Sequence, residues 1–194
     1  MREKLSEFIA NNLDAEFIMD NFDLINSGSS RDVYAISKSI VAKVAKEDSN
    51  GQRQNLKEYQ VFEQCFSYQD MSDDDIKNDL SHIRFGNLYE DDAVRIAKGI
   101  VNSLAIVYAI SPNNDILLME RLEGIVRGNI DLEEPSLIFL KQRFSLFEGD
   151  LQAGENWMYN VDGDTKIVDY GCDDDIAENH TEWGNLDKYD LDDE

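Results

Sequence analysis

The stretch from residue 147 to 171, FEGDLQAGENWMYNVDGDTKIVDYG, constrains the fold of this chain more than any other. Its two short apolar runs, WMY and KIV, flank a segment with an Asp-Gly dipeptide, which predicts two strands joined by a tight turn. Because a hairpin brings its ends together, Asp150 and Asn156 before it are expected to lie close to Asp169 after it. Two carboxylates and an amide oxygen at one point can hold a hard cation such as Mg²⁺, with phosphates completing its shell.

Charge and composition narrow the class of protein. The chain has 194 residues, of which 41 are acidic and 18 basic, so the formal net charge is -23. Such a surface repels nucleic acid and anionic lipid, and it favours a basic protein partner. Two cysteines predict no disulfide framework, and the two histidines lie away from the motifs below, which disfavours a Ser-His-Asp triad. Because no run reaches the roughly 18 apolar residues of a membrane span, we expect a cytoplasmic protein without membrane contact.

Apolar patterning predicts an α+β fold in one compact unit of at most two small lobes. Residues 22–44 hold three short apolar runs separated by turn signals, which indicates an antiparallel meander. Residues 101–110 and 116–119 predict a second hairpin that extends the sheet to about five strands. Between them, residues 54–66 carry one apolar helical face, and the largely polar residues 67–98 predict a helical insertion on the surface.

The two ends of the chain differ from this pattern. Residues 1–21 carry apolar side chains mostly at steps of three and four, which predicts an N-terminal helical segment. Residues 137–147 predict a helix that leads into the stretch described first. Residues 172–194 are strongly acidic and predict a tail that docks weakly or stays disordered.

Taken in order, these pieces resemble the protein-kinase-like fold. The letters INSGSSRDVY are similar to the glycine-rich loop G-x-G-x-x-G-x-V, whose small residues let backbone N–H groups close over nucleotide phosphates. Gly28 stands at the middle glycine, while Asn26 and Arg31 stand where the other two would fall. The resemblance implies that Gly28 and Ser29 lie against the phosphates.

A lysine and a glutamate follow in the order of the same family. The letters IVAK resemble the V-A-I-K strand, which implies that Lys43 reaches the α and β phosphates. Glu58, on the next helix, stands where the ion-pair partner of that lysine is expected. The plain alternative is an exposed strand lysine and a solvated helix glutamate, and Lys46 is a rival for the phosphate-binding role.

The letters LLMERL resemble the hinge that follows the fifth strand of a kinase. Met119 stands at the gatekeeper position, and the resemblance implies that backbone groups of Glu120 and Leu122 hydrogen-bond the adenine. Val33, Val41 and Met119 would pack on its faces and edge. The alternative is that these residues are simply the core of a hairpin.

The letters VDYG resemble the D-F-G motif, which implies that Asp169 bridges Mg²⁺ to the β and γ phosphates. Asp150 stands where the catalytic aspartate orients or accepts the hydroxyl proton of an acceptor, although Glu148 replaces the histidine of that motif. The metal-binding asparagine of the family follows this aspartate by five residues, whereas Asn156 follows Asp150 by six. Either one inserted residue is absorbed at Gly154, or Glu155 is the ligand, or the second metal position is lost.

The resemblance covers residues 22–171 and implies a two-lobed kinase-like fold. Residues 22–122 would form the N-lobe, a five-stranded antiparallel sheet with a helix and the helical insertion. Residues 123–171 would form a strongly reduced helical C-lobe with the catalytic hairpin. The tail of residues 172–194 stands where kinases place an activation segment and several helices, as in small kinase-like proteins of bacteria and their phages.

Two functions are open from the sequence. The first is an ATP- and Mg²⁺-dependent phosphotransferase that moves a phosphoryl group to a protein or small-molecule hydroxyl. The second is a non-catalytic pseudokinase-type protein whose acidic surface docks a basic partner or mimics DNA.

Overall fold

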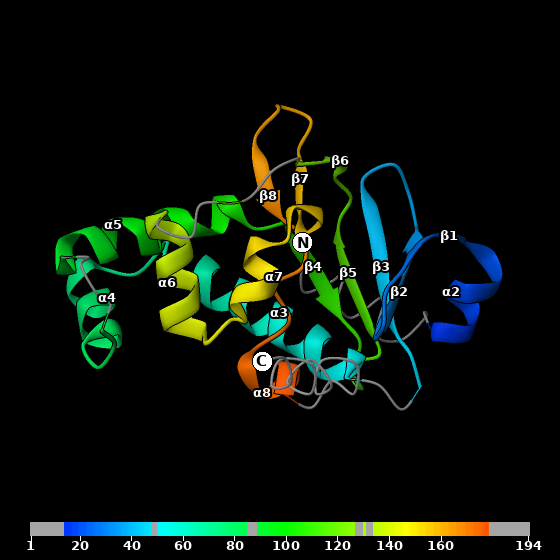
Figure 1. Cartoon of the computed structure of the whole chain (residues 1–194), viewed down its shortest axis with the longest axis horizontal. Helices are drawn as coiled ribbons and strands as arrows, with labels where there is room; N and C mark the ends of the chain where they lie inside the picture. The colour runs from blue at the N-terminus through cyan, green and yellow to red at the C-terminus, as the bar shows by residue number, and fades with distance from the viewer. Residues whose placement is uncertain (1–13, 48–49, 85–88, 127–129, 131–133, 179–194) are drawn as a thin grey trace, which may run out of the picture.

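The computed structural model describes residues 14–47, 50–84, 89–126, 130 and 134–178. A five-stranded antiparallel sheet dominates one side of the molecule (Figure 1), which confirms the mixed α+β class and the expected sheet. The strands, in spatial order, are β1 (Asp23–Ser27), β2 (Arg31–Ala35), β3 (Ile40–Ala45), β5 (Ile116–Glu120) and β4 (Val107–Ile110).

The two faces of this sheet are covered by different helices. Strand alternation sends Ala42 and Val44 to the face where Ile18 of α2 (Ala15–Asn21) is fully buried. Val41 points to the opposite face, which packs on α3 (Gly51–Ser67). At Gly51 an added Cβ would lie 2.4 Å from the carbonyl oxygen of Ser30, so glycine lets α3 begin directly against the sheet.

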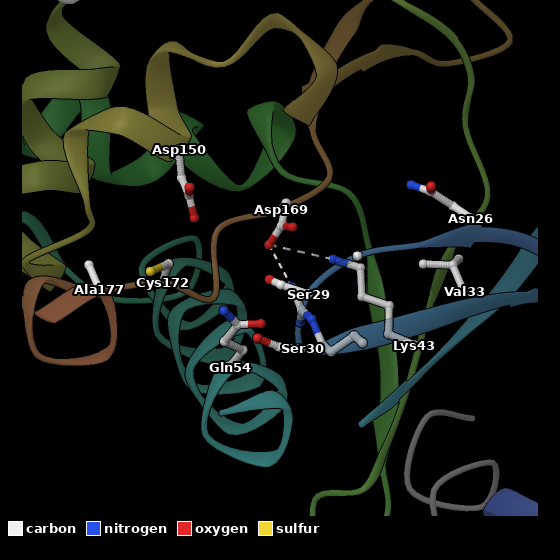
Figure 2. Close-up of a pocket in the computed structure, with 12 residues that line it drawn as sticks. Asn26, Ser29, Ser30, Val33, Lys43, Gln54, Asp150, Asp169, Cys172 and Ala177 are labelled. Carbon is white, nitrogen blue, oxygen red and sulfur yellow. Dashed lines mark hydrogen bonds and ion pairs between the residues drawn. The ribbon is translucent and has the colours of Figure 1, made fainter. Parts of the chain in front are cut away.

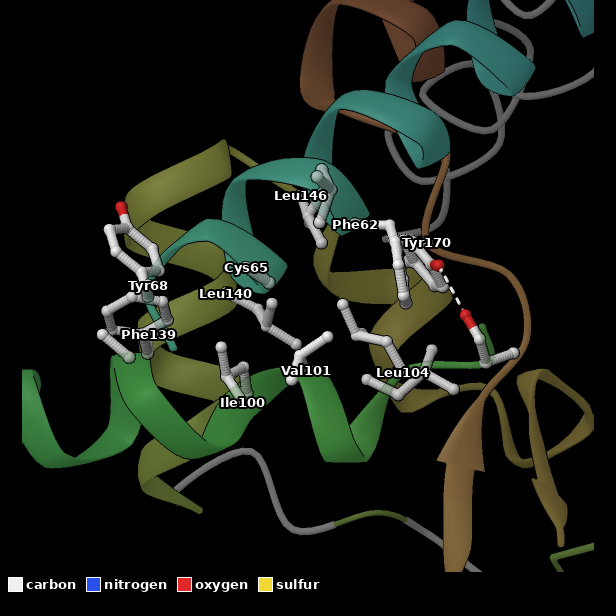
Figure 3. Close-up of a cluster of buried hydrophobic side chains, with 14 of the residues drawn as sticks. Phe62, Cys65, Tyr68, Ile100, Val101, Leu104, Phe139, Leu140, Leu146 and Tyr170 are labelled. Carbon is white, nitrogen blue, oxygen red and sulfur yellow. Dashed lines mark hydrogen bonds between the residues drawn. The ribbon is translucent and has the colours of Figure 1, made fainter. Parts of the chain in front are cut away.

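The second part of the core is helical (Figure 3). Tyr68, Phe139 and Leu140 pack there with Leu104 and Tyr170. The elements are α4 (Asp73–Leu80), α5 (Glu90–Gly99), the 3₁₀ helix η1 (Ile100–Ser103) and α6 (Pro135–Phe144). The expected insertion at residues 67–98 is therefore helical, but α4 and α5 bury one apolar face in the core and do not lie only on the surface.

The strand expected over residues 101–110 is wrong in its first half. Residues up to Ser103 are helical, and the strand begins only at Val107. Val101 and Leu104 bury their side chains in the helical core, so packing outweighs the β preference of this β-branched run.

The predicted hairpin is confirmed. β7 (Trp157–Tyr159) and β8 (Thr165–Ile167) pair antiparallel, with Gly163 at φ +88° in the turn between them. After β5 the chain continues into β6 (Glu123–Ile125), which adds a third strand in the order β6-β7-β8.

The last described residues pack against α3. After β8, residues 168–173 run along this helix into α8 (Asp174–Glu178), where Ile176 and Ala177 are buried. Lys57 of α3 pairs with Asp173 at 2.9 Å. The start of the expected acidic tail is thus packed, whereas its residues 179–194 lie outside the described residues. Of the helical segment expected over residues 1–21, α2 is described and residues 1–13 lie outside the described residues. Within the described residues, no helix combines the length and apolar character needed to span a membrane.

We expect Gly171→Ala to destabilise the protein, because an added Cβ would lie 2.5 Å from the Gln54 carbonyl oxygen and 2.8 Å from Glu58 Cγ. Overpacking of this kind lowers the free energy of unfolding by roughly 1–3 kcal/mol. The matched control is Gly28→Ala, whose Cβ would meet only the Arg31 carbonyl oxygen at an ordinary 3.5 Å. Urea unfolding of both variants measures the difference, and equal losses would contradict the close approach at Gly171.

Candidate functional site

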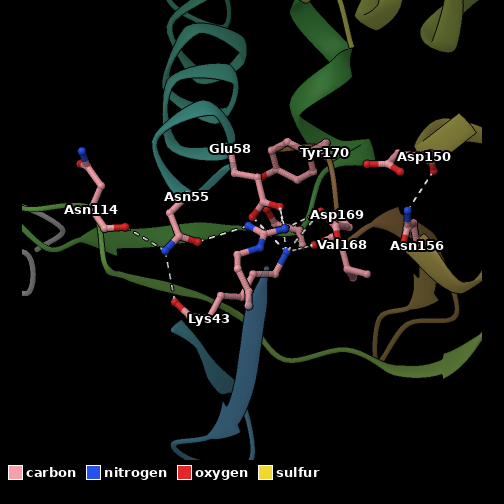
Figure 4. Close-up of polar contacts among 11 residues, drawn as sticks. Lys43, Asn55, Glu58, Asn114, Asp150, Asn156, Val168, Asp169 and Tyr170 are labelled. Carbon is pink, nitrogen blue, oxygen red and sulfur yellow. Dashed lines mark hydrogen bonds and ion pairs between the residues drawn. The ribbon is translucent and has the colours of Figure 1, made fainter. Parts of the chain in front are cut away.

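Lys43 and Glu58 meet in the interior between the sheet and α3 (Figure 4). Lys43 Nζ lies 2.8 Å and 3.0 Å from the two carboxylate oxygens of Glu58 and donates to the Val168 carbonyl oxygen at 2.5 Å. The Lys43 side chain is 7% exposed and that of Glu58 is fully buried. The predicted pair is therefore formed, and the alternative of an exposed lysine with a solvated glutamate is wrong.

Arg31 joins this pair to Asp169. Arg31 Nη2 lies 2.9 Å from Glu58 Oε1 and 2.5 Å from Asp169 Oδ1, while Lys43 Nζ is 3.9 Å from the same Asp169 oxygen. Arg31 Nη1 donates to Asn55 Oδ1 at 3.2 Å. Two cations and two carboxylates thus form one internally neutral cluster, as burial of charge requires.

The cluster shifts the proton affinities of its carboxyl groups. Burial opposes ionisation of Asp169, but the charges of Arg31 and Lys43 outweigh it and hold its pKa well below the usual range. Burial also raises the pKa of Glu58, and the same two cations act against that rise.

Asp150 lies across from this cluster, on the short helix α7 (Glu148–Gln152). Burial, and then the negative charge of Asp169, raises its pKa to about 7. Asn156, in the 3₁₀ turn η2 (Gly154–Asn156), donates from Nδ2 to the Asp150 backbone oxygen at 3.0 Å. The hairpin therefore does bring the neighbourhoods of Asp150, Asn156 and Asp169 together, as expected from the sequence.

Two hollows meet at Lys43 and Asp169. The larger, of about 370 Å³, has both apolar and polar residues in its lining. Its lining includes Val33, Val41, Lys43, Met119, Glu120, Leu122, Glu155, Asn156, Met158, Val168 and Asp169. The smaller, of about 150 Å³, is drawn in Figure 2. Its lining includes Gly28, Ser29, Arg31, Lys43, Asp150, Asp169 and Cys172.

The residues expected at the hinge contact the larger hollow, with one restriction. The Glu120 backbone N–H already donates to the Ile106 carbonyl oxygen at 2.7 Å, and its side chain accepts from Lys166 Nζ at 2.8 Å. Any contact of the Glu120 backbone with a ligand must therefore use its carbonyl oxygen.

The rival lysine has a different place. Lys46 Nζ donates to the Gly28 carbonyl oxygen at 2.5 Å and pairs with Asp32 at 3.3 Å. Lys46 holds the loop that precedes β2 and is not among the lining residues of either hollow.

In this structure the described residues around Asp169 do not form a ready site for a divalent cation. Asp169 Oδ1 is engaged by Arg31, and no cluster of three His, Cys, Asp or Glu side chains among the described residues could hold a metal ion. Glu155 and Asn156 both line the larger hollow, so either can supply one further oxygen. A cation at Asp169 would have to compete with Arg31 and bring most of its oxygen ligands with it.

Arg31 stands at the place of a loop glycine, and its role in the cluster was not expected from the sequence. The available signal was strand alternation: Arg31 lies two residues before Val33 in β2, and Val33 pairs across the strands with Lys43. An arginine at that position must point to the same face as the lysine. Asn55, which orients Arg31 and is fully buried, carried no such signal.

No family model, curated protein or solved structure matches this chain. The function must therefore be argued from the geometry of the site.

We expect the free energy of unfolding to depend on pH through the titration of Asp150. A carboxyl whose folded pKa of about 7 exceeds the ordinary 3.8 stabilises the fold below pH 4 and loses that contribution as pH rises through 7. The Asp150→Asn variant has no carboxyl at this position and lacks this loss. The free energy of unfolding of the variant, minus that of wild type, should therefore rise between about pH 4 and pH 8 and then level off. The facing groups Arg31, Glu58, Asp169 and Cys172 are unchanged in both proteins.

Urea unfolding at several pH values measures this difference. Asp70→Asn is the control, because Asp70 is exposed in the turn after α3. If the difference in free energy of unfolding between wild type and Asp150→Asn does not change with pH in this range, the raised pKa of Asp150 is contradicted.

Proposed function

We propose that the protein is a reduced protein-kinase-like phosphotransferase, which binds ATP and moves its terminal phosphoryl group to a hydroxyl of a protein or small molecule. The observation that carries the proposal is the position of the Lys43–Glu58 pair. It lies beside Asp169 where the two hollows meet. A buried carboxylate that fixes a lysine is a suitable way to aim one ammonium group at phosphate oxygens.

The larger hollow suits the base of a nucleotide. Its volume of about 370 Å³ is within the usual range of small-molecule sites, roughly 300–1,000 Å³. Val33, Val41 and Met119 line its apolar part, and Leu122 belongs to the segment just after β5. An adenine ring packed there would leave its phosphates directed toward Lys43 and Asp169.

The smaller hollow suits the acceptor. A hydroxyl between Asp150 and Asp169 could give its proton to Asp150 while its oxygen attacks the γ-phosphorus, and the bond to the β-phosphate breaks to release ADP. A carboxyl with a pKa of about 7 is well matched to accept a proton near neutral pH. Catalysis would come mainly from positioning and charge neutralisation.

In this proposal residues 22–122 are the N-lobe and residues 123–171 the reduced C-lobe. The Mg²⁺ site that the sequence predicts at Asp169, with Asn156 or Glu155, is not part of this proposal because Arg31 already engages Asp169, and no step of the transfer is assigned to it. Residues 172–178 close the acceptor side, because Cys172 and Ala177 line the smaller hollow.

The second candidate is a non-catalytic binding protein. Two observations favour it: the net charge of -23 and the ion pair that already satisfies Asp169. Its acidic surface would dock a basic protein or mimic DNA, and that binding would weaken steeply with salt. Binding of this kind would not respond to Lys43→Ala, which separates it from the first candidate.

The proposal predicts that millimolar ATP with Mg²⁺ raises the melting temperature of the wild type by several degrees, because a ligand that binds only the native state stabilises it. Lys43→Ala should remove most of this ligand-induced shift, measured relative to the unliganded variant. The matched control is Lys98→Ala, since Lys98 pairs with Asp73 on the distant α4–α5 surface. A wild type that does not respond to ATP would refute the phosphotransferase.

A further inference from the structure

Arg31 occupies an unusual place for a cation. The sequence puts it in the loop segment where small residues would normally approach phosphates, yet its side chain is only 5% exposed. Strand β2 fixes its direction, because Arg31 and Val33 point to one face of the sheet and Val33 lies opposite Lys43 in β3. The guanidinium is therefore built into the same face as the phosphate-directed lysine.

Three groups from other elements hold the guanidinium in place. Arg31 contacts Glu58 at 2.9 Å, Asp169 at 2.5 Å and Asn55 at 3.2 Å. The amide of Asn55 is itself oriented, since its Nδ2 donates to the Asn114 carbonyl oxygen at 2.9 Å. Two of the three partners come from α3, so the position of Arg31 does not depend on Asp169 alone.

The contact with Asp169 is the one that matters for ligand binding. Asp169 is 37% exposed and lines both hollows, so it is the carboxylate of the cluster that an entering ligand meets. A divalent cation on this carboxylate would stand close to two fixed positive charges, Arg31 and Lys43, in a partly buried site where repulsion is weakly screened.

We propose that Arg31 is the resident counter-ion of Asp169, holding the place a divalent cation would take, so that a nucleotide binds through Lys43 and Arg31 without a divalent cation. The claim about nucleotide binding rests on the proposed function. The claim that Arg31 takes the place of a cation rests only on the contacts of the buried cluster. Arg31 lines the smaller hollow, and its N–H donors beyond the three contacts above have no partner among the described residues. Those donors are suited to phosphate oxygens.

The first test uses the wild-type protein. Isothermal titration with ATP in excess EDTA and with ATP in excess Mg²⁺ should give dissociation constants within about threefold of each other. Arg31→Met should bind ATP about tenfold or more weakly than wild type in EDTA, because one of the two proposed phosphate-binding cations is absent. Arg95→Met is the matched control, as Arg95 is 75% exposed and, within the described part of the chain, pairs only with Asp92 of its own helix. Wild-type binding that is more than tenfold weaker in EDTA would overturn the inference.

The second test needs no nucleotide. Mn²⁺ alone, followed by electron paramagnetic resonance, should bind wild type and Asp169→Asn equally weakly, because Arg31 already holds this carboxylate. The comparison also subtracts Mn²⁺ bound elsewhere on the acidic surface. Arg31→Met should bind Mn²⁺ about tenfold more tightly, and Asp169→Asn in that background should reverse the gain. A wild-type site that binds Mn²⁺ tightly and is lost in Asp169→Asn would refute the role of Arg31.

The two tests separate this inference from the function on which it builds. If wild type binds ATP in neither buffer, the phosphotransferase falls, and the Mn²⁺ series still decides whether Arg31 holds the metal position. If wild type binds ATP only with Mg²⁺, the phosphotransferase stands and the inference falls. If Arg31→Met fails to fold by circular dichroism, the wild type and Asp169→Asn decide both questions.

Discussion

The fully buried carboxylate of Glu58 is the constraint on which the rest of the structure depends. A buried charge is costly unless it is paired and hydrogen-bonded, and Glu58 receives Lys43 from β3 and Arg31 from β2. Those two cations exceed one carboxylate, and Asp169 restores neutrality. The sheet, α3 and the segment after β8 must therefore meet at one point, because none of the four charges is stable there alone.

Neutral contacts then fix the segment that delivers Asp169. The Val168 carbonyl oxygen accepts from Lys43, and the hydroxyl of the buried Tyr170 donates to the Ala105 carbonyl oxygen at 2.9 Å. Gly171 allows the chain to pass against α3 where any side chain would collide. The same contacts that stabilise the fold thus set the position of the Asp169 carboxylate, which faces both hollows. A substitution that weakens these contacts should therefore affect both the stability of the fold and the geometry of the site.

The sequence predicted features that depend on local pattern. The strand over residues 40–45, the helix with Glu58 and the hairpin around Gly163 follow from apolar periodicity and turn residues, and the order of motifs predicted that Lys43 would meet Glu58. It could not predict features set by distant packing. Val101 is helical because it fits the helical core, and the role of Arg31 depends on Asn55, which no local pattern connects to it.

Charge on the whole molecule and charge in the site have opposite consequences. With a formal net charge of -23, the protein as a whole repels an approaching nucleotide, and the buried cluster of two cations and two carboxylates adds no net attraction. Affinity for an anion must therefore come from short-range contacts inside the hollows, where water is partly excluded and each hydrogen bond to a charged group is stronger. In the proposed function, recognition of a nucleotide would therefore depend on the N–H donors of Lys43 and Arg31 and on the shape of the larger hollow beside them.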